Sequence, residues 1–146
     1  EYARNVKKIR YANSTEISEK CKDPVIDLMI SQKEIVNKGG TMRLGAWDCE
    51  IQKKTNSYNA YKKKLVSERH RHRYEFNNNY SKRIFDDKFI VSGYNPETKL
   101  VEIVENIDHP WFVGVQFHPE YKSSVYNPHP IFVNFVKASL KNYLNK

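Results

Sequence analysis

Residues 111–120 read Trp-Phe-Val-Gly-Val-Gln-Phe-His-Pro-Glu, and this segment constrains the fold of the chain more than any other. A short, nearly continuous apolar run with β-branched and aromatic residues predicts a buried strand over 111–117. Pro119 has no backbone N–H to donate to a neighbouring strand, so the strand must end beside it. His118 is therefore expected at the tip of a strand, with Glu120 two residues further on.

A histidine and a carboxylate at a strand tip are two of the three parts of a catalytic triad. In open α/β sheets, functional residues gather at the carboxyl ends of strands. A neutral imidazole there can take a proton from a nucleophile, while a carboxylate fixes its tautomer and stabilises the imidazolium. The sequence therefore predicts His118 as a general base and Glu120 as its orienting partner. The alternative is a strand end with two solvated polar residues.

Several segments resemble one enzyme family. Gln116-Phe-His-Pro-Glu120 is similar to the His–Glu element of the triad-type glutamine amidotransferases, in which a cysteine thiolate attacks the side-chain amide of glutamine and releases ammonia. Other segments narrow the resemblance to the glutaminase domain of the CTP synthase family, from residue 1 to about residue 140. They are Ala12-Asn-Ser-Thr-Glu16, Gly39-Gly-Thr-Met-Arg-Leu-Gly45, Glu68-Arg-His-Arg-His-Arg-Tyr-Glu75 with Asn77-Asn78, Asn106-Ile-Asp-His-Pro-Trp-Phe112 and His129-Pro130.

The resemblance implies an α/β, flavodoxin-like glutamine amidotransferase domain that occupies residues 1–146 and is incomplete at its N-terminus. It implies a glutaminase that supplies ammonia for the ATP-dependent amination of UTP to CTP. ATP and Mg²⁺ would bind to a synthase domain of the same polypeptide, in a parent enzyme that is a homo-tetramer. The chain itself is expected to bind L-glutamine and no cofactor or metal. The alternative is a non-catalytic pseudo-glutaminase that serves regulation or assembly.

The expected nucleophile is not found in this sequence. In the family it lies on a Gly-x-Cys-x-Gly elbow, a strained strand-to-helix turn that exposes the sulfur and supplies backbone N–H groups for the oxyanion. Cys21 and Cys49 are the two cysteines present, and neither has flanking glycines. The opening residues Glu1-Tyr-Ala-Arg-Asn5 resemble the end of the helix that follows the elbow. We therefore expect the chain to begin shortly after the catalytic cysteine and to be inactive by itself.

Glutamine recognition requires two charged groups. Free glutamine carries an α-ammonium and an α-carboxylate, so its pocket needs an acidic acceptor and favours a forked guanidinium. Glu16 and Arg73 have these groups, and the family resemblance assigns glutamine binding to these two positions. Each also has a plain alternative. Glu16 would fit the first turn of a helix capped by Ser14 or Thr15, and Arg73 would fit a surface strand, with residues 69 and 71 as second candidates on the same face.

Arg43 is flanked by glycines in the segment 39–45. The resemblance connects this region with the route between the glutaminase and synthase domains and with activation by GTP. Taken by itself, the sequence predicts an exposed cation suited to a phosphate or to a partner carboxylate.

The chain is basic, with a formal net charge of +8, a balance that is typical of proteins that bind nucleic acids. Its richest basic stretch, residues 69–73, alternates arginine with histidine at the two-residue period of a strand. The lysine clusters at 53–54 and 62–64 are typical of solvated surfaces. Nucleic-acid binding is therefore not expected as a principal role. His70 and His72 could chelate a metal, but no third ligand has suitable spacing, so packed or hydrogen-bonded histidines are favoured.

Composition predicts a cytoplasmic protein that does not bind membranes. No apolar run approaches the ~20 residues needed to cross a bilayer. The sequence shows no signal peptide, and two distant cysteines give no disulfide framework.

The hydrophobic patterns predict one α/β unit without repeats. Strands are expected over 24–30, within 41–52, over 69–76 and over 111–117, with a hairpin of 88–92 and 100–105 and a polar loop over 32–40. Helices are expected over 1–9, 58–65, 77–86 and 130–143. The last helix has an apolar stripe that should pack on the sheet. Its members are Ile131, Phe132, Phe135, Val136, Leu140 and Tyr143.

Overall fold

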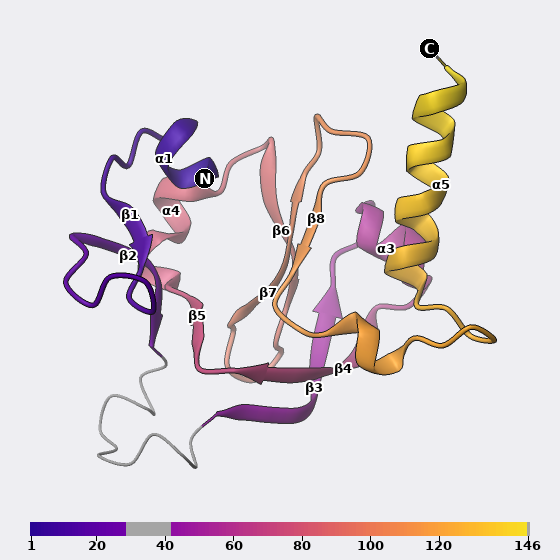
Figure 1. Ribbon diagram of the computed structural model, residues 1–146, viewed down its shortest axis with the longest axis horizontal. Helices are drawn as coiled ribbons and strands as arrows, with labels where there is room; N and C mark the ends of the chain where they lie inside the picture. The colour runs from indigo at the N-terminus through magenta and orange to yellow at the C-terminus, as the bar shows by residue number, and fades with distance from the viewer. Residues whose placement is uncertain (29–41, 146) are drawn as a thin grey trace.

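The computed structural model describes residues 1–28 and 42–145, so the predicted loop over 32–40 lies outside the described residues. The described strands form two sheets (Figure 1). The smaller sheet has the order β1 (Ala12–Ser14), β2 (Asp23–Leu28) and β5 (Tyr74–Phe76). The larger has the order β4 (Leu65–His72), β3 (Arg43–Ile51), β6 (Phe89–Tyr94), β7 (Val101–Asn106) and β8 (Val113–Val115). The predicted hairpin is confirmed as β6 and β7.

The single strand predicted over 69–76 is divided between the two sheets. β4 begins earlier, at Leu65, and pairs antiparallel with β3, whereas β5 pairs antiparallel with β2. Arg73 lies between the two strands, so the backbone changes sheets at this residue. The prediction of one strand was wrong because the two-residue alternation continues through the crossing and does not reveal a change of partner.

The larger sheet curls until its two edges approach each other. β8 and β4 are its edge strands. The backbone N–H of His118, shortly after β8, nevertheless donates to the carbonyl of Arg69 on β4 over 2.8 Å. The side chain of Lys122 donates to the carbonyl of Ser67, also on β4. The segment that follows β8 therefore lies against the opposite edge of the same sheet.

The described helices are short except for the last. They are α1 (Tyr2–Asn5), α3 (Asn56–Tyr61), η2 (Asn78–Tyr80), α4 (Ser81–Ile84), η3 (Pro119–Lys122) and α5 (Pro130–Leu144). The helix predicted over 58–65 ends early, because Lys62 adopts a left-handed backbone with φ 56°. The predicted cap at Asn77 is confirmed, since its side chain accepts from the N–H of Asn79. No described helix is long and apolar enough to cross a membrane.

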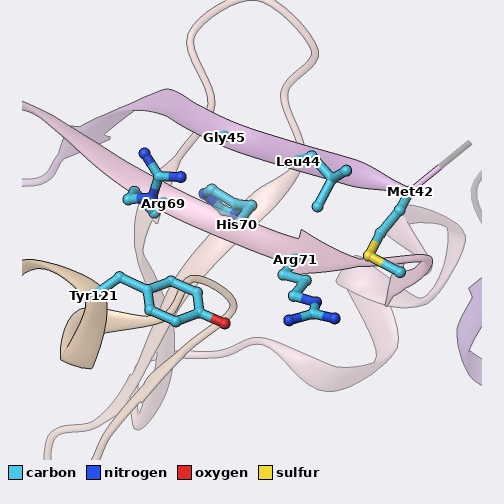
Figure 2. Close-up of a pocket in the computed structure, with 7 residues that line it drawn as sticks. All are labelled: Met42, Leu44, Gly45, Arg69, His70, Arg71 and Tyr121. Atoms are coloured by element: carbon cyan, nitrogen blue, oxygen red, sulfur yellow. The ribbon is translucent and has the colours of Figure 1, made fainter.

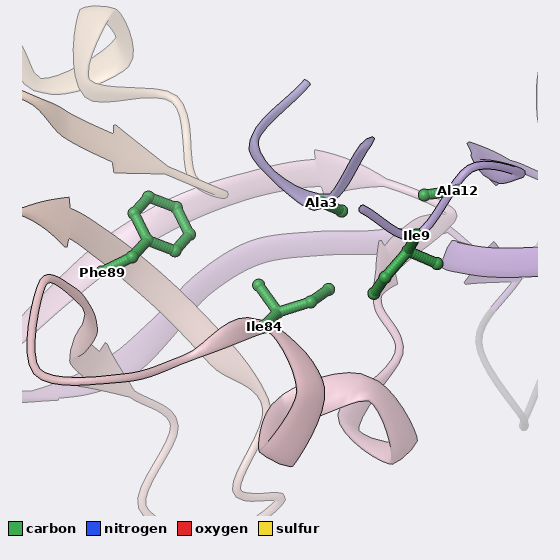
Figure 3. Packing of buried hydrophobic residues seen from close by; sticks show 5 residues of the cluster. All are labelled: Ala3, Ile9, Ala12, Ile84 and Phe89. Atoms are coloured by element: carbon green, nitrogen blue, oxygen red, sulfur yellow. The ribbon is translucent and has the colours of Figure 1, made fainter. Parts of the chain in front are cut away.

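An apolar cluster packs the first residues of the chain against both sheets (Figure 3). Its buried members come from α1, β1, α4 and β6 and the turn before β1: Ala3, Ile9, Ala12, Ile84 and Phe89. Tyr2 stacks on Phe89 with ring centroids 4.1 Å apart. A second apolar cluster contains Cys49 and Ile51 of β3, Ile103 of β7 and Phe117, which follows β8. It packs the end of β8 against the larger sheet.

The apolar stripe of α5 does not pack on a sheet, so that prediction was wrong for the described residues. Ile131 is buried, but Phe135 is 52% exposed and Tyr143 is 74% exposed. The helix is held at its first turn, where Nδ1 of His129 accepts from the N–H of Ile131. Nε2 of His129 donates to buried Glu68 over 3.1 Å. Periodicity shows that a helix has an apolar face, but it does not show what covers that face.

Candidate active site

β8 leads directly into the predicted histidine and glutamate. The expected buried strand over 111–117 is confirmed only in part, because β8 covers Val113–Val115 and its residues are half-buried. Phe117 is buried in the second apolar cluster, and the next side chain, that of His118, is 38% exposed. Pro119 is buried and begins η3, which carries Glu120. The buried residues on either side of His118 thus fix the backbone that presents it.

The two side chains meet as the sequence predicts. Nδ1 of His118 lies 2.6 Å from Oε1 of Glu120. An ionised carboxylate can only accept, so Nδ1 carries the proton and Nε2 of the neutral ring keeps its lone pair. Burial acts to raise the pKa of Glu120, but hydrogen bonds from its own backbone N–H and from His118 outweigh it and lower that pKa. The carboxylate is therefore ionised at neutral pH and orients the ring as a general base requires.

Tyr121 is a further member of this site, to which no role could be assigned from the sequence. Its ring stacks on His118 with centroids 5.1 Å apart and an interplanar angle of 26°. Figure 2 shows Tyr121 facing β4 across an open pocket lined by Met42, Leu44, Gly45, Arg69, His70 and Arg71. The available signal was an aromatic residue in the proline-initiated turn that follows the histidine. The exposed arginines of β4 thus line the same pocket as Tyr121, whose ring stacks on His118.

Arg73 lies at the carboxyl edge of the smaller sheet. Tyr74, the next residue, pairs with Leu28 at the end of β2. Arg73 is half-buried, and its buried Nε has no hydrogen-bond partner. No carboxylate among residues 1–28 and 42–145 forms an ion pair with it. This guanidinium is available to a ligand carboxylate.

Glu16 lies at the same edge, because it follows β1 and β1 runs parallel to β2. Its backbone N–H donates to Oγ of Ser14 in a turn, so the alternative of a helix start is wrong. Thr15 and Tyr74, the immediate neighbours of Glu16 and Arg73, line one pocket. No hydrogen bond or ion pair within the described residues joins Glu16 to Arg73 or either of them to His118, so their shared role in binding stays a prediction.

Arg43 is buried, so the prediction of an exposed cation was wrong. Its side chain is 1% exposed, with Nη2 2.6 Å from Oε1 of Glu102 and Nη1 3.3 Å from Oε2 of Glu75. The guanidinium also lies 4.6 Å from the ring centre of Trp47. Flanking glycines could not reveal two carboxylates that are 59 and 32 residues away in sequence. A role of Arg43 in GTP activation stays a prediction, and it would have to act from within the fold.

His70 and His72 are hydrogen-bonded to each other, with Nδ1 of His70 3.0 Å from Nε2 of His72. The preference for packed or hydrogen-bonded histidines is therefore confirmed. Within the described parts of the chain, no group of three or more histidine, cysteine, aspartate or glutamate side chains is arranged to hold a metal.

Neither cysteine has the environment of an activated nucleophile. Cys49 is fully buried, and burial together with the nearby carboxyl of Glu102 raises the pKa of its thiol far above the usual range. A raised thiol pKa removes the thiolate that would attack an amide. Cys21 precedes β2, at the end of that strand remote from Leu28. Cys21 lines one pocket with Thr15 and Tyr74, but it has no flanking glycine, and no contact within the described residues joins it to His118.

The family follows from comparison with known proteins. Residues 5–138 match the family described as "Glutamine amidotransferase class-I". The chain belongs to this family.

Within the family, its relatives are CTP synthases. The chain is 58% identical over 139 residues to the CTP synthase of Christiangramia forsetii, an alignment that covers 95% of the chain and 26% of that protein. It is 53% identical over 146 residues to the CTP synthase of Clostridium beijerinckii, covering 100% of the chain and 27% of that protein. The chain thus spans about a quarter of the length of these curated relatives.

A solved structure agrees with this assignment. The Trypanosoma brucei CTPS glutaminase domain with bound acivicin superposes with a TM-score of 0.86 at 35% identity, covering 96% of this chain and 55% of that one. The fold class is therefore that of a CTP synthase glutaminase domain, a flavodoxin-like class-I amidotransferase, as the sequence predicts. The comparisons favour the glutaminase over a non-catalytic regulatory fragment.

Proposed function

We propose that this chain forms the part of a CTP synthase glutaminase domain that carries the general base and the residues that hold glutamine. The single observation that carries the proposal is the pair at the end of β8, with Nδ1 of His118 2.6 Å from Oε1 of Glu120. The names of the relatives support it.

The chemistry follows from the orientation of the pair. Nε2 of His118 accepts the proton of a cysteine thiol as the sulfur attacks the side-chain carbonyl carbon of glutamine. When the tetrahedral intermediate collapses, the carbon–nitrogen bond breaks and His118 returns the proton to the leaving ammonia. Water then hydrolyses the thioester, with His118 again as the base. Glu120 remains ionised throughout and stabilises the imidazolium.

Glutamine is held by its α-substituents. Arg73, which has no carboxylate partner within the described residues, binds the α-carboxylate, and Glu16 binds the α-ammonium. In the full-length enzyme, Arg73→Ala or Glu16→Ala should raise the KM for glutamine and leave ammonia-dependent CTP formation near normal. Equal losses with both nitrogen sources would show that the two residues are structural.

The nucleophile is a cysteine other than Cys21 and Cys49. The buried thiol of Cys49 and the absence of flanking glycines at Cys21 support this. The 146-residue chain by itself should therefore release no ammonia from glutamine above background, and the electrophile 6-diazo-5-oxo-norleucine should not label it. Covalent labelling of either cysteine together with ammonia release would contradict the proposal.

In the whole enzyme, the ammonia is consumed in the ATP-dependent amination of UTP to CTP. A synthase domain of the same polypeptide would hold UTP, ATP and Mg²⁺. Such a domain would account for the part of the relatives that this chain does not cover. The homo-tetramer stays a prediction.

The decisive experiment replaces the base in the full-length enzyme. His118→Gln should lower glutamine-dependent CTP formation roughly 10²–10⁴-fold, the usual contribution of a general base, with ammonia-dependent formation within twofold of wild type. His109→Gln is the matched control, because His109 is an exposed turn residue whose side chain accepts from the N–H of Trp111 and meets the ring of Phe112 edge-on. Full glutamine-dependent activity in His118→Gln would overturn the proposed function.

A further inference from the structure

A connected set of buried polar side chains lies behind Arg73, and the proposed mechanism uses none of them. Arg43 on β3 of the larger sheet joins Glu75 on β5 of the smaller sheet to Glu102 on β7. These ion pairs therefore fasten the two sheets together beside the residue at which the chain crosses between them. His70 and His72 continue the set along β4.

The contact with a backbone carbonyl and the neutral state of the rings together assign the ring protons of His72 and His70. Nδ1 of His72 lies 3.1 Å from the carbonyl oxygen of Tyr74, and a carbonyl can only accept, so Nδ1 of His72 carries a proton. Burial, followed by the charge of Arg43, lowers the pKa of His72 to about 4 and that of His70 to about 3, so both rings are neutral. Nε2 of His72 is then an acceptor, and Nδ1 of His70 donates to it.

The far end of the set is Glu102. Nε2 of His70 keeps a lone pair and faces Oε2 of Glu102 at 3.6 Å, too far for a hydrogen bond. That oxygen is buried and has no partner. Burial raises the pKa of Glu102 to about 7 in spite of the opposing charge of Arg43, so this carboxyl holds a proton more readily than an ordinary glutamate. The neutral histidines are thus compatible with the buried acid beside them.

The near end of the set is the carbonyl of Tyr74. It accepts from His72 and, over 3.4 Å, from the side-chain amide of Gln116, in the segment that leads to His118. His72 and Tyr74 flank Arg73 on either side. Because both neighbours are held, the backbone at the crossing has little freedom. The Arg73 guanidinium has no carboxylate partner among the described residues to orient it, so its direction depends on that backbone.

We propose that His72 is a positioning residue for glutamine recognition, which holds the Tyr74 carbonyl and thereby aims the guanidinium of Arg73 at the α-carboxylate of the substrate. This inference rests on the proposed function and deepens it. Because the α-carboxylate is remote from the bond that breaks, loss of the positioning weakens ground state and transition state alike. The effect therefore belongs to the KM for glutamine and leaves kcat unchanged.

The test compares two amides at position 72 of the full-length enzyme. The amide nitrogen of asparagine takes the place of Nδ1 of histidine and can still donate to Tyr74, whereas that of glutamine takes the place of Nε2 and cannot. His72→Gln should raise the KM for glutamine at least tenfold, with kcat and ammonia-dependent activity within twofold of wild type. His72→Asn should restore the KM to within threefold of wild type, and His109→Gln is the matched control that should change nothing.

Gln116→Met provides a second test of the same carbonyl, because it removes the other donor at similar volume. It should raise the KM for glutamine about threefold with kcat unchanged, and it decides the matter if His72→Gln fails to fold. A KM within twofold of wild type in both variants would overturn the inference, as would an equal rise in His72→Asn and His72→Gln.

Arg73→Ala separates this inference from the proposed function. If Arg73→Ala raises the KM for glutamine while His72→Gln and Gln116→Met do not, the positioning role alone is wrong. If Arg73→Ala leaves the KM for glutamine unchanged, Arg73 does not bind glutamine, and that part of the proposed function is wrong.

Discussion

Two of the histidine–glutamate pairs among the described residues, one at the surface and one in the interior, are found in opposite surroundings. At the tip of β8, the His118 and Glu120 side chains are 38% and 54% exposed and share a hydrogen bond of 2.6 Å. Within the fold, His70 and Glu102 are 1% and 0% exposed and lie 3.6 Å apart. In the exposed pair the carboxylate is ionised and the imidazole can take up a proton. In the buried pair the imidazole is held neutral, and burial raises the pKa of Glu102 to about 7.

The difference in solvent exposure determines whether a histidine–glutamate pair can take part in proton transfer. At His118, solvent and a hydrogen-bonded carboxylate surround the imidazole that has to take up a proton during each turnover. Removing charges from water is costly, so a buried histidine stays neutral and serves to hold its neighbours in place. The exposed pair is therefore expected to govern kcat, and the buried set is expected to govern stability and substrate affinity.

The largest expected effect is on turnover. Glu120→Gln replaces a carboxylate that can only accept with an amide that can also donate to Nδ1 of His118, which allows the wrong tautomer. Loss of the orienting carboxylate in a triad lowers kcat roughly 10⁴-fold, and we expect roughly 10³–10⁴-fold for glutamine-dependent CTP formation. The matched change Glu102→Gln should leave kcat within threefold. Comparable losses of kcat in the two variants would remove the distinction between the pairs.

The next largest effect is on stability, and here we expect the buried pair to matter more than the exposed pair. Glu102→Ala leaves buried Arg43 with only the more distant carboxylate of Glu75, and breaking a buried ion pair costs about 3–5 kcal/mol of unfolding free energy. Glu120→Ala alters an exposed side chain and should cost less than about 0.5 kcal/mol. Urea unfolding followed by tryptophan fluorescence measures both, because Trp47 lies against Arg43. A Glu102→Ala variant as stable as Glu120→Ala would show that the buried ion pairs do not hold the sheets together.

The pH dependence of stability should also separate the pairs. Burial raises the folded-state pKa of Glu102 to about 7, with Arg43 opposing and Glu75 adding to the rise. The native state then binds more protons than the unfolded state between about pH 4.5 and 7, so wild type should lose stability relative to Glu102→Gln as pH rises through this window, by at most roughly 3 kcal/mol. The lowered pKa of Glu120 acts with the opposite sign, and its contribution is lost as pH falls below about 4.5. A constant difference between wild type and Glu102→Gln from pH 4.5 to 7 would contradict this.

The smallest effect concerns how the exposed pair is held. Lys122 in η3 donates to the carbonyl of Ser67 and so ties the turn that carries Glu120 to β4. Lys122→Met should lower glutamine-dependent kcat about threefold, because a looser turn presents the base less often in its productive geometry. Lys63→Met, an exposed lysine next to the helix α3, is the matched control. Identical kcat in the two variants would show that Pro119 and Phe117 suffice to place the pair.

Much of the site could be predicted because its signals are local. An apolar run stopped by proline places His118 at a strand tip, and the spacing of two residues brings Glu120 back to it. Arg43 could not be predicted in the same way, because its environment depends on carboxylates 32 and 59 residues away. The contribution of Tyr121 was equally hidden, since stacking on His118 depends on how η3 returns toward β4.

The hairpin of β6 and β7, the capped turn at Asn77 and the adjacency of His118 and Glu120 could be predicted from the sequence, since these depend on hydrogen bonds and periodicities within a few residues. Only the tertiary structure decided that the strand of alternating arginine and histidine crosses between two sheets at Arg73. The curl that brings the end of β8 against β4, and the burial of Arg43, likewise depend on it. The two-residue alternation of a strand determines on which face of the sheet a side chain lies, but it does not determine which other part of the protein packs against that face. That packing decides whether a charged side chain is solvated, forms an ion pair or can bind a substrate.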